Sequence, residues 1–574
     1  MSVGIVTGAA SRDENGNIYA RHEIRDLKDN YPDQWSLYMF ALARLQQADQ
    51  SDPYSFYGIG SIHGRPYQTW GDAPGLPNKI GKAGYCPHDN ELFLGWHRPY
   101  LALFEQVLSS HVHDIAANAP PDQIKRYLAA ANEFRMPYWD WAQGTKTGPA
   151  PDIFLSPTIM VRDTSGVSKG LDNPLFSYQF HPLPQGFEGK WRYINTTIRW
   201  PASDDPWTPS RPLMFAEAFK NQSNNLVSQT GVAFRSSSFS RFSSTLEDVH
   251  GWVHGVIGGG YQRESPYWGH MWPLEYSAFE PLFMLHHANV DRLFALYQAA
   301  HPDTWMQPSN VGTQTNVFLA DNQQITADTP LLPFRKDANT FWTTNACRDT
   351  TSLGYSYPET QRWKFASDES YQANAASVIA RLYSGRMLAQ KNNMFTDWSI
   401  ESSVPTDTFR DTFRVQFGLA PGGEKPVEVG SWMVLLPSHQ KGEQGVHPGV
   451  GVDRLYGTAS LTAALVDRVN SGALASLEPG DVVPFLRQAL VWDVLDDDGE
   501  SLPKSMRDKV NVTVLSTQAR IPQEEGAPIE YWASVIKDVA WAKTVAWDEL
   551  RKNQGRRWNE MSAEIIWILQ CHNK

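Results

Sequence analysis

Six of the sixteen histidines fall into two groups, and these groups limit the fold more than any other feature of the chain. The first group lies in GSIHGRPY and YCPHDNELFLGWHRPY, and the second in LEDVHGWVH and FEPLFMLHHANVDRL. In chain order the six are His63, His88, His97, His250, His254 and His287. A fold for this chain has to explain why imidazoles recur in these surroundings.

The second group has helical spacing. His250 and His254 are four residues apart, so both rings leave the same face of a helix. On a second predicted helix, His287 and Asp291 are also four apart. His286 is rotated by about 100° from His287 on a helix, so only one of the two can face a shared site. We therefore expect two partner helices that present imidazoles to one centre.

An imidazole-only donor set favours copper, zinc or nickel, whereas a di-iron site in a helical bundle would use glutamates. Three neutral imidazoles on each of two ions leave positions open between the metals, where dioxygen can bind. One pair of histidines at this spacing is also common in ordinary helix cores. Two sets on helices with matching flanks indicate a dinuclear metal centre, and a structural zinc protein would leave the second set unexplained.

The helical pattern is discontinuous along the chain. Residues 51–90 are rich in Gly, Pro and Tyr and predict a long loop carrying His63 and His88. A helix is expected from Tyr100, with Pro99 near its first turn. Residues 142–245 predict extended, loop-rich covering. The further helices are expected at residues 32–45, 246–257 and 280–299.

The sequence pattern changes from helical to β-rich after about residue 355, where short β-rich segments such as TFRVQFGL, VGSWMVLLP and VNVTVLST appear between turns. The sequence thus predicts a mainly α core, a four-helix bundle around the metal site, followed by a β-rich C-terminal domain. We expect the boundaries to be 1–360 for the first domain, 361–395 for a linker and processing region, and 396–574 for the β-rich domain with a helical tail.

Composition excludes several classes of function. The formal net charge of −12 is spread without long runs, which argues against nucleic acid or an anionic membrane as partner. No apolar run approaches the ~20 residues of a membrane helix, and the N-terminus lacks the features of a signal peptide. Three cysteines are too few for a disulfide framework. We expect an intracellular, cytoplasmic protein.

The block GYCPHDNELFLGWHRPYLALFEQVL, with HGWVH and FEPLFMLHHANVDRLFALY, resembles the type-3 copper family of tyrosinases, catechol oxidases and haemocyanins, and fungal tyrosinases above all. The resemblance covers about residues 19–360. It implies two copper ions that bind dioxygen between them. Carried over by position, His63, His88 and His97 would bind copper A, and His250, His254 and His287 copper B.

The resemblance also assigns roles to neighbours of the ligands. Cys86 stands where fungal members form a thioether to the histidine two residues on, here His88. Arg98 and Asp291 stand where the family pairs two helices, and we expect them to support the ligands. Tyr355-Ser-Tyr357 resembles the tyrosine motif that closes the core domain.

Phenolic substrates follow from the same resemblance, with oxidation of o-diphenols to o-quinones as the expected reaction. Glu247 matches a family glutamate that holds a water for deprotonating monophenols. Gly251 follows His250 at the position where strong monophenolases of the family carry Asn or Asp. This difference favours an enzyme that mainly oxidises diphenols over the alternative, a true tyrosinase with strong monophenolase activity. Phe283 is expected to stack on a ligand ring or line the pocket.

The β-rich region resembles the C-terminal shielding domain of fungal pro-tyrosinases. In the family this domain covers the copper entrance until an activating protease releases it, and Tyr456 is our candidate for an inserted aromatic side chain. The sequence leaves open whether the protein forms a homo-oligomer. A haemocyanin-like oxygen carrier is the alternative from another class, and it fits a single core poorly because carriers of this family are large multi-unit assemblies.

Overall fold

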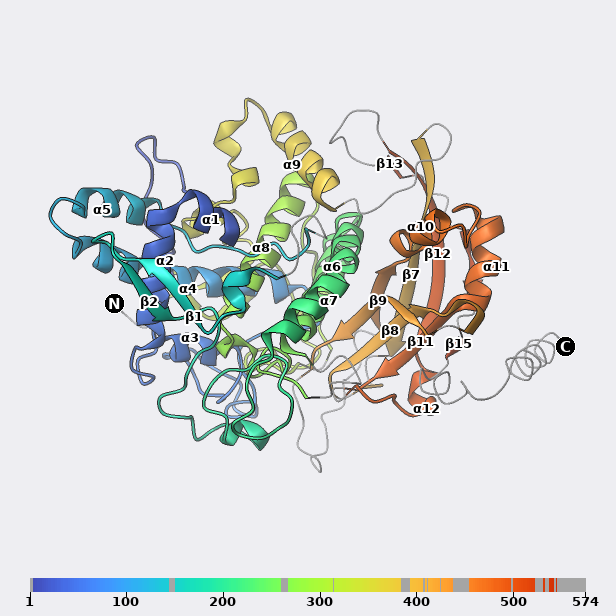
Figure 1. Ribbon diagram of the computed structural model, residues 1–574, viewed down its shortest axis with the longest axis horizontal. Coiled ribbons are helices and arrows are strands. Elements are labelled where there is room, and N and C mark those ends of the chain that lie inside the picture. Colours follow the sequence, from blue (N-terminus) through green and yellow to red (C-terminus); the bar gives the residue numbers. More distant parts are fainter. Residues whose placement is uncertain are drawn as a thin grey trace.

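The computed structural model describes residues 4–143, 150–259, 267–312, 314–383, 393–405, 408–409, 411–423, 425–436, 454–496 and 499–521, with three short strands between 530 and 544. The helical tail was expected from Glu530 onward, but the described parts of its first fifteen residues are strands that pair with the sheets, so this part of the prediction was wrong. The rest of the expected tail, with Cys571, lies outside the described residues. Figure 1 shows a helical domain on the left and a β-rich domain on the right. The prediction of a mainly α core followed by a β-rich domain is confirmed.

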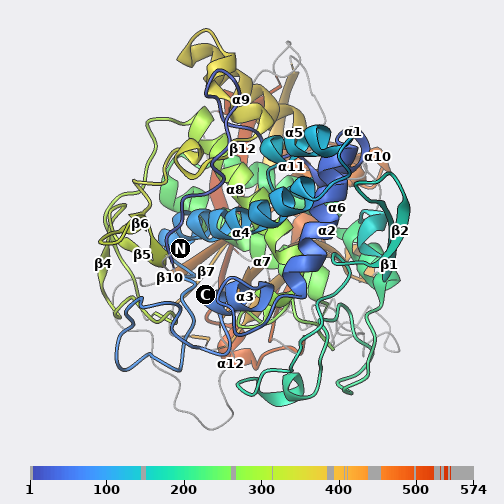
Figure 2. The same cartoon turned by 90° about the vertical axis from the view of Figure 1, so that its left-hand side faces the viewer.

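The first domain is built from helices that surround the predicted metal site, with short strand pairs at its surface. The helices are α1 (Ile24–Asn30), α2 (Pro32–Gln46), α3 (Phe56–His63), α4 (Leu92–Ala117), α5 (Ile124–Glu133), α6 (Pro212–Phe234), α7 (Phe239–Gly258) and α8 (Leu282–Ala300). The strand pairs are β1 (Thr158–Arg162) with β2 (Ser168–Asp172), β3 (Ser309–Asn310) with β4 (Gln324–Ile325), and β5 (Pro330–Arg335) with β6 (Phe341–Thr343). Viewed from the side of the first domain, α4 crosses in front of α7 and α8 (Figure 2).

Helix α4 corrects one prediction. It begins at Leu92 and not at Tyr100, so Pro99 lies inside it. An interior proline leaves the carbonyl four residues earlier without its helical donor. Here that carbonyl belongs to Gly95 and accepts a hydrogen bond from the Cys347 thiol, with Sγ 3.7 Å from the oxygen. The tertiary contact therefore compensates for the bond that Pro99 cannot make.

Two loop predictions were also wrong. His63 is the last residue of α3, whose N-cap Ser55 accepts a hydrogen bond from the Gly58 N–H. The stretch 142–245 contains α6, a 23-residue helix that packs on α7. Small and polar residues alternate with apolar ones on the buried face of α6, so its apolar periodicity is weak and the sequence pattern does not reveal it.

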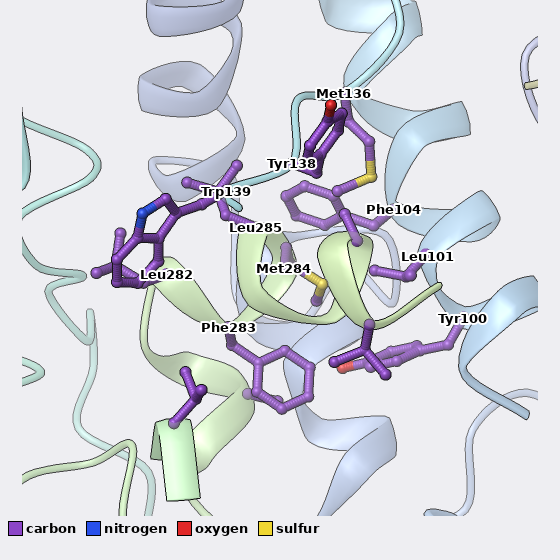
Figure 3. Close-up of a cluster of buried hydrophobic side chains, with 14 of the residues drawn as sticks. Tyr100, Leu101, Phe104, Met136, Tyr138, Trp139, Leu282, Phe283, Met284 and Leu285 are labelled. Atoms are coloured by element: carbon purple, nitrogen blue, oxygen red, sulfur yellow. The ribbon is translucent and has the colours of Figure 1, made fainter. Parts of the chain in front are cut away.

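Helices α4 and α8 are held together by a large apolar core (Figure 3). Leu101 and Phe104 of α4 pack with Met284 and Leu285 of α8, and all four are at most 3% exposed. At the start of α8, the Glu280 carboxylate accepts a hydrogen bond from the Leu282 N–H. This packing fixes the two helices that carry ligands from the opposite histidine groups.

The C-terminal domain consists of two sheets with helices on their flank. One sheet has the order β10 (Arg454–Ser460), β7 (Met394–Pro405), β12 (Asn511–Arg520), β13 (Glu530–Tyr531), with β14 (Ile536–Ala540) also on β12. The other has the order β15 (Lys543–Thr544), β11 (Leu490–Leu495), β8 (Phe413–Leu419), β9 (Val427–Val434). The helices are α10 (Thr462–Asn470), α11 (Pro479–Ala489) and α12 (Lys504–Arg507).

The region predicted as a linker, residues 361–395, contains a helix, α9 (Asp368–Tyr383). Helix α9 packs on α6 and α8, and the Tyr383 hydroxyl at its end accepts a hydrogen bond from Arg292 of α8 (2.7 Å). Much of this stretch is therefore part of the first domain. Residues 384–393 join α9 to β7.

Candidate metal centre

The structure brings all six predicted ligands into one buried space between α3, α4, α7 and α8. Each of the six histidines is at most 5% exposed. The rings of His97 and His287 stack with centroids 4.2 Å apart, although they come from different groups. The centroids of His63 and His88 are 5.6 Å apart, and those of His250 and His254 are 4.5 Å apart.

Backbone carbonyls orient four of these rings through Nδ1. The carbonyl partners are Leu274 for His63 (3.1 Å), Phe93 for His97 (2.8 Å), Glu247 for His250 (3.2 Å) and Met271 for His254 (2.7 Å). Because a carbonyl only accepts, the proton sits on Nδ1 and the lone pair is on Nε2.

Those lone pairs face a shared space without partners. Nε2 of His63 and of His254 has no hydrogen-bond partner, and Nε2 of His250 lies 3.2 Å from Nε2 of His287. Converging buried lone pairs repel one another unless a cation lies among them. The donor set therefore fits metal ions, and neutral imidazoles are the donors that copper accepts.

Burial keeps these imidazoles neutral. It lowers the pKa of His97 to about 3 and of His254 to about 4, and it lowers the pKa of His63 and His287 well below the ordinary value, with neighbouring histidines adding to the shift. A metal ligand must be unprotonated, so the pocket prepares the histidines for binding.

His286 lies closer to the centre than its predicted orientation implies. One nitrogen from each of His250, His254, His286 and His287 lies within 4.8 Å of the others. The His286 ring stacks on that of His250 at 5.1 Å, and neither of its nitrogens has a hydrogen-bond partner. His287 remains our choice as ligand because its Nε2 meets that of His250.

Cys86 lies beside His88, as the thioether prediction requires. Its Sγ is 3.3 Å from Nδ1 and 3.8 Å from Nε2 of His88. The carbon between those nitrogens, Cε1, is bonded to both and therefore lies next to the sulfur. Burial raises the pKa of the Cys86 thiol well above its ordinary value.

Arg98 and Asp291 form the predicted pair between α4 and α8. Arg98 Nε lies 2.7 Å from Asp291 Oδ1, and both side chains are at most 2% exposed. The hydroxyls of Tyr355 and Tyr357 each donate to Asp291 Oδ2 at 2.6 Å. Arg21, which no motif singled out, joins this network, with its Nη1 3.5 Å from Asp291 Oδ2.

Glu247 is half-buried and lies at the wall of a cavity. This cavity, of about 420 Å³, is also lined by His88 and His250, and Glu247 Oε1 accepts a hydrogen bond from the Asp89 N–H (2.9 Å). Burial raises the pKa of Glu247 well above its ordinary value, and the Asp89 carboxylate raises it further. The sequence analysis missed Asp89 and Asp248, which line the same cavity.

The other predicted pocket residues lie around the same histidines. The Phe283 ring is 4.1 Å from that of His287 and 4.9 Å from that of His63. Gly251 lines the cavity, and a Cβ added there would lie 3.5 Å from Cγ of Leu435.

Tyr456 lines the cavity, but its side chain is 60% exposed. The C-terminal residues that are buried against α7 are instead Met433 and Leu435, at 2% and 4% exposure. Both belong to the apolar core of the first domain. Residues 437–453, which connect these residues to β10, lie outside the described part of the chain.

Two family profiles match the chain. The common central domain of tyrosinase matches residues 53–300, and the tyrosinase C-terminal domain matches residues 397–514. A tyrosinase from Podospora anserina is 38% identical over 400 residues, covering 65% of this chain and 68% of the relative. A tyrosinase from Neurospora crassa is 37% identical over 402 residues, covering 65% of this chain and 57% of the relative.

Solved structures with the same fold include recombinant mushroom tyrosinase, with a TM-score of 0.77 and 24% identity, covering 94% of this chain and all of the other. A holo-protyrosinase from Aspergillus oryzae has a TM-score of 0.71 and 19% identity, covering 95% of this chain and 99% of the other. The arrangement of both domains is thus shared.

Proposed function

This chain belongs to the tyrosinase family, and we propose that it is a type-3 dicopper phenol oxidase that uses dioxygen to oxidise o-diphenols to o-quinones. The convergence of six buried, neutral imidazoles in one space carries this proposal. His63, His88 and His97 would hold one copper ion, and His250, His254 and His287 the other. When bound, the copper pair supplies the two-electron redox chemistry that couples phenol oxidation to dioxygen reduction.

The protein's own residues would position the substrate and handle its protons. Phe283 lies against His287 and His63 and offers an apolar surface for a phenol ring. Glu247 lies at the cavity wall between the two histidine sets, and its raised pKa makes its carboxylate a better proton acceptor. The Asp89 N–H holds that carboxylate in place.

We expect diphenol oxidation to exceed monophenol hydroxylation. A catechol needs only to lose two electrons and two protons, whereas a monophenol must also be deprotonated and aimed by its ortho carbon. Gly251 has no side chain with which to orient a water for Glu247, so the second reaction lacks a positioning group. Strong, lag-free monophenol hydroxylation would overturn this part of the proposal.

The C-terminal domain is proposed to keep the enzyme latent. Met433 and Leu435 at the end of β9 are buried against α7, which carries His250 and His254. Trp432, Met433 and Leu435 also form one wall of the cavity that reaches His88 and His250. A phenol can then reach the histidines freely only after this wall is removed, and we place the cleavage by an activating protease in residues 384–393.

No helix within the described residues is long and apolar enough to cross a membrane.

The test is to count copper and to measure oxidation of 4-methylcatechol and of 4-ethylphenol, before and after limited proteolysis of the copper-loaded chain. We expect two coppers per chain, a rise in catechol oxidation after cleavage and a much smaller rate with the monophenol. Fewer than two coppers would overturn the dinuclear site. Reversible dioxygen binding without catechol turnover would indicate an oxygen carrier instead.

A further inference from the structure

His270 is a buried histidine that belongs to neither ligand set. It lies in the segment between α7 and α8 and is 0% exposed. Within the described residues, the groups of three or more side chains that could hold a metal ion do not include it. Its position has to be explained by its hydrogen bonds, because a buried polar ring without partners costs free energy.

Two hydrogen bonds join His270 to Ile198, which is also buried. The His270 N–H donates to the Ile198 carbonyl (3.0 Å), and His270 Nδ1 accepts from the Ile198 N–H (3.1 Å). A backbone N–H only donates, so Nδ1 carries the lone pair and the proton of the neutral ring is on Nε2. Four of the ligand histidines have the opposite arrangement, with the proton on Nδ1. His270 therefore acts as an acceptor for the backbone and not as a metal ligand.

Apolar rings surround His270 and keep it neutral. Its ring centroid lies 4.1 Å from that of Trp191 and 5.9 Å from that of Phe180. Burial lowers the pKa of His270 well below its ordinary value, and Lys190 lowers it further. Nε2 makes no hydrogen bond within the described residues, so the ring acts through Nδ1 alone.

The turn that contains His270 also supplies a hydrogen-bond acceptor to the metal centre. The Trp272 N–H donates to the Gly269 carbonyl (3.2 Å), which closes a four-residue turn with His270 and Met271 at its centre. The Met271 carbonyl accepts from His254 Nδ1 (2.7 Å) and so leaves the lone pair of His254 on Nε2. A carbonyl orients a ligand ring only if the turn that carries the carbonyl is itself held in place.

The same turn is attached to the end of α7. The N–H groups of Gly269 and Trp200 both donate to the Gly258 carbonyl, at 3.0 and 2.9 Å. A Cβ on Gly269 would lie 1.9 Å from the Ile198 carbonyl oxygen, so only glycine allows this close approach. His254 lies about one helical turn before Gly258. The turn therefore contacts the helix that carries His254 and also binds the ring of His254.

We propose that His270 is a positioning residue for the second metal position, because it holds the turn whose Met271 carbonyl orients His254. The inference rests on the proposed function for the identity of the metal. Without the Nδ1 acceptor, the Ile198 N–H would be buried and unpaired, and the turn would lose one of its two bonds to Ile198. His254 would then bind copper less tightly.

The first set has a separate anchor. The Leu274 carbonyl, which accepts from His63 Nδ1 (3.1 Å), lies further along the same segment. The neighbouring Glu275 carbonyl accepts from the Arg65 N–H (2.8 Å), and this bond holds the segment against the end of α3. A change at His270 should therefore weaken copper binding at the second set more than at the first.

The test measures the affinity of each set for Cu(I) by competition with a chromophoric chelator, in two backgrounds of the full-length chain. His88→Ala disables the first set, and His250→Ala disables the second. In the His88→Ala chain, His270→Phe should weaken copper binding about tenfold. His270→Asn should weaken it less than about threefold, because the amide oxygen can replace Nδ1 as acceptor. The His250→Ala chain is the matched control, in which both substitutions should weaken binding less than about threefold.

Equal weakening in the two backgrounds, no weakening by His270→Phe, or equal weakening by His270→Asn and His270→Phe would each overturn the inference. Circular dichroism checks that each variant is folded. If His270→Phe does not fold, His270→Gln takes its place, because its amide oxygen lies one bond further from the backbone than that of Asn. The same difference from His270→Asn is then expected, and equal affinities of these two variants would overturn the inference.

Copper affinity involves no turnover, so the result is separate from that of the proposed function. A chain that binds copper in both backgrounds and does not respond to His270 refutes only the inference. A chain with the expected affinities that does not oxidise catechol refutes only the oxidase. A chain that binds copper in neither background refutes both.

Discussion

His250, His254 and His287 all lie within two continuous helices, whereas in the first set only His97 lies within a helix: His63 ends one and His88 lies in the segment before one. The two sets provide the same number of imidazoles by different means. In the second set, helix geometry alone brings the rings together once α7 and α8 pack. In the first set, contacts between distant backbone segments have to do this.

Those contacts are specific in the first set. A Cβ on Gly84 would lie 2.2 Å from the His63 carbonyl oxygen, so this segment can approach the end of α3 only with glycine. The Asn90 side chain donates to the His88 carbonyl (2.9 Å) and accepts from the Leu92 N–H at the start of α4 (3.0 Å). The first histidine set therefore depends on single backbone contacts, whereas the second set depends on the broad apolar core that packs its helices.

The largest effect is expected where the two halves are joined. Arg98→Met leaves the Asp291 carboxylate buried with one cation fewer, which should lower the free energy of unfolding by about 3–5 kcal/mol in denaturant titrations. Arg126→Met removes an exposed pair with Asp33 and should cost at most about 1 kcal/mol. Equal losses in the two variants would show that the halves are not coupled through this pair.

The sequence predicted the positions of His250, His254 and His287 better than those of His63 and His88, because helix spacing can be seen in a local stretch of sequence whereas contacts between distant segments cannot. The i, i+4 spacing of His250 and His254 is a local signal, and the structure contains their helix. The position of His63 was mistaken for a loop because the glycines in FYGIGSIH hide a buried helix. Asp89 and Asp248 carried no periodic signal, since their importance comes from the cavity that they share with β9.

A glycine comparison tests whether the first half is the more sensitive one. Gly84→Ala forces a Cβ against backbone atoms of His63 that cannot move aside, and we expect a loss of about 1–3 kcal/mol with weaker copper retention. Gly251→Ala places its Cβ 3.5 Å from Leu435, an ordinary contact, and should change unfolding by at most about 0.5 kcal/mol in the same denaturant assay. The comparison fails if Gly251→Ala is the more damaging change.

Among the contacts of the first set, Cys86 is expected to have the smallest effect on stability, because its proposed thioether restrains His88 alone. Cys86→Ala removes one buried sulfur and should lower the free energy of unfolding by about 1 kcal/mol. The clearer effect of Cys86→Ala should be on copper retention. A chelator should extract the ion held by the first set faster than it does from the native chain, because His88 has lost a restraint. The ion held by α7 and α8 should leave at the native rate. Cys347→Ala, which removes a buried cysteine away from His88, is the matched control.

Intact mass adds an independent measurement, since a thioether makes the copper-loaded native chain lighter by two hydrogens than its sequence requires. A native chain at full sequence mass, or equal loss of both ions in Cys86→Ala, would mean that the first set is held without the cross-link and that Asn90 and Gly84 suffice to place His88.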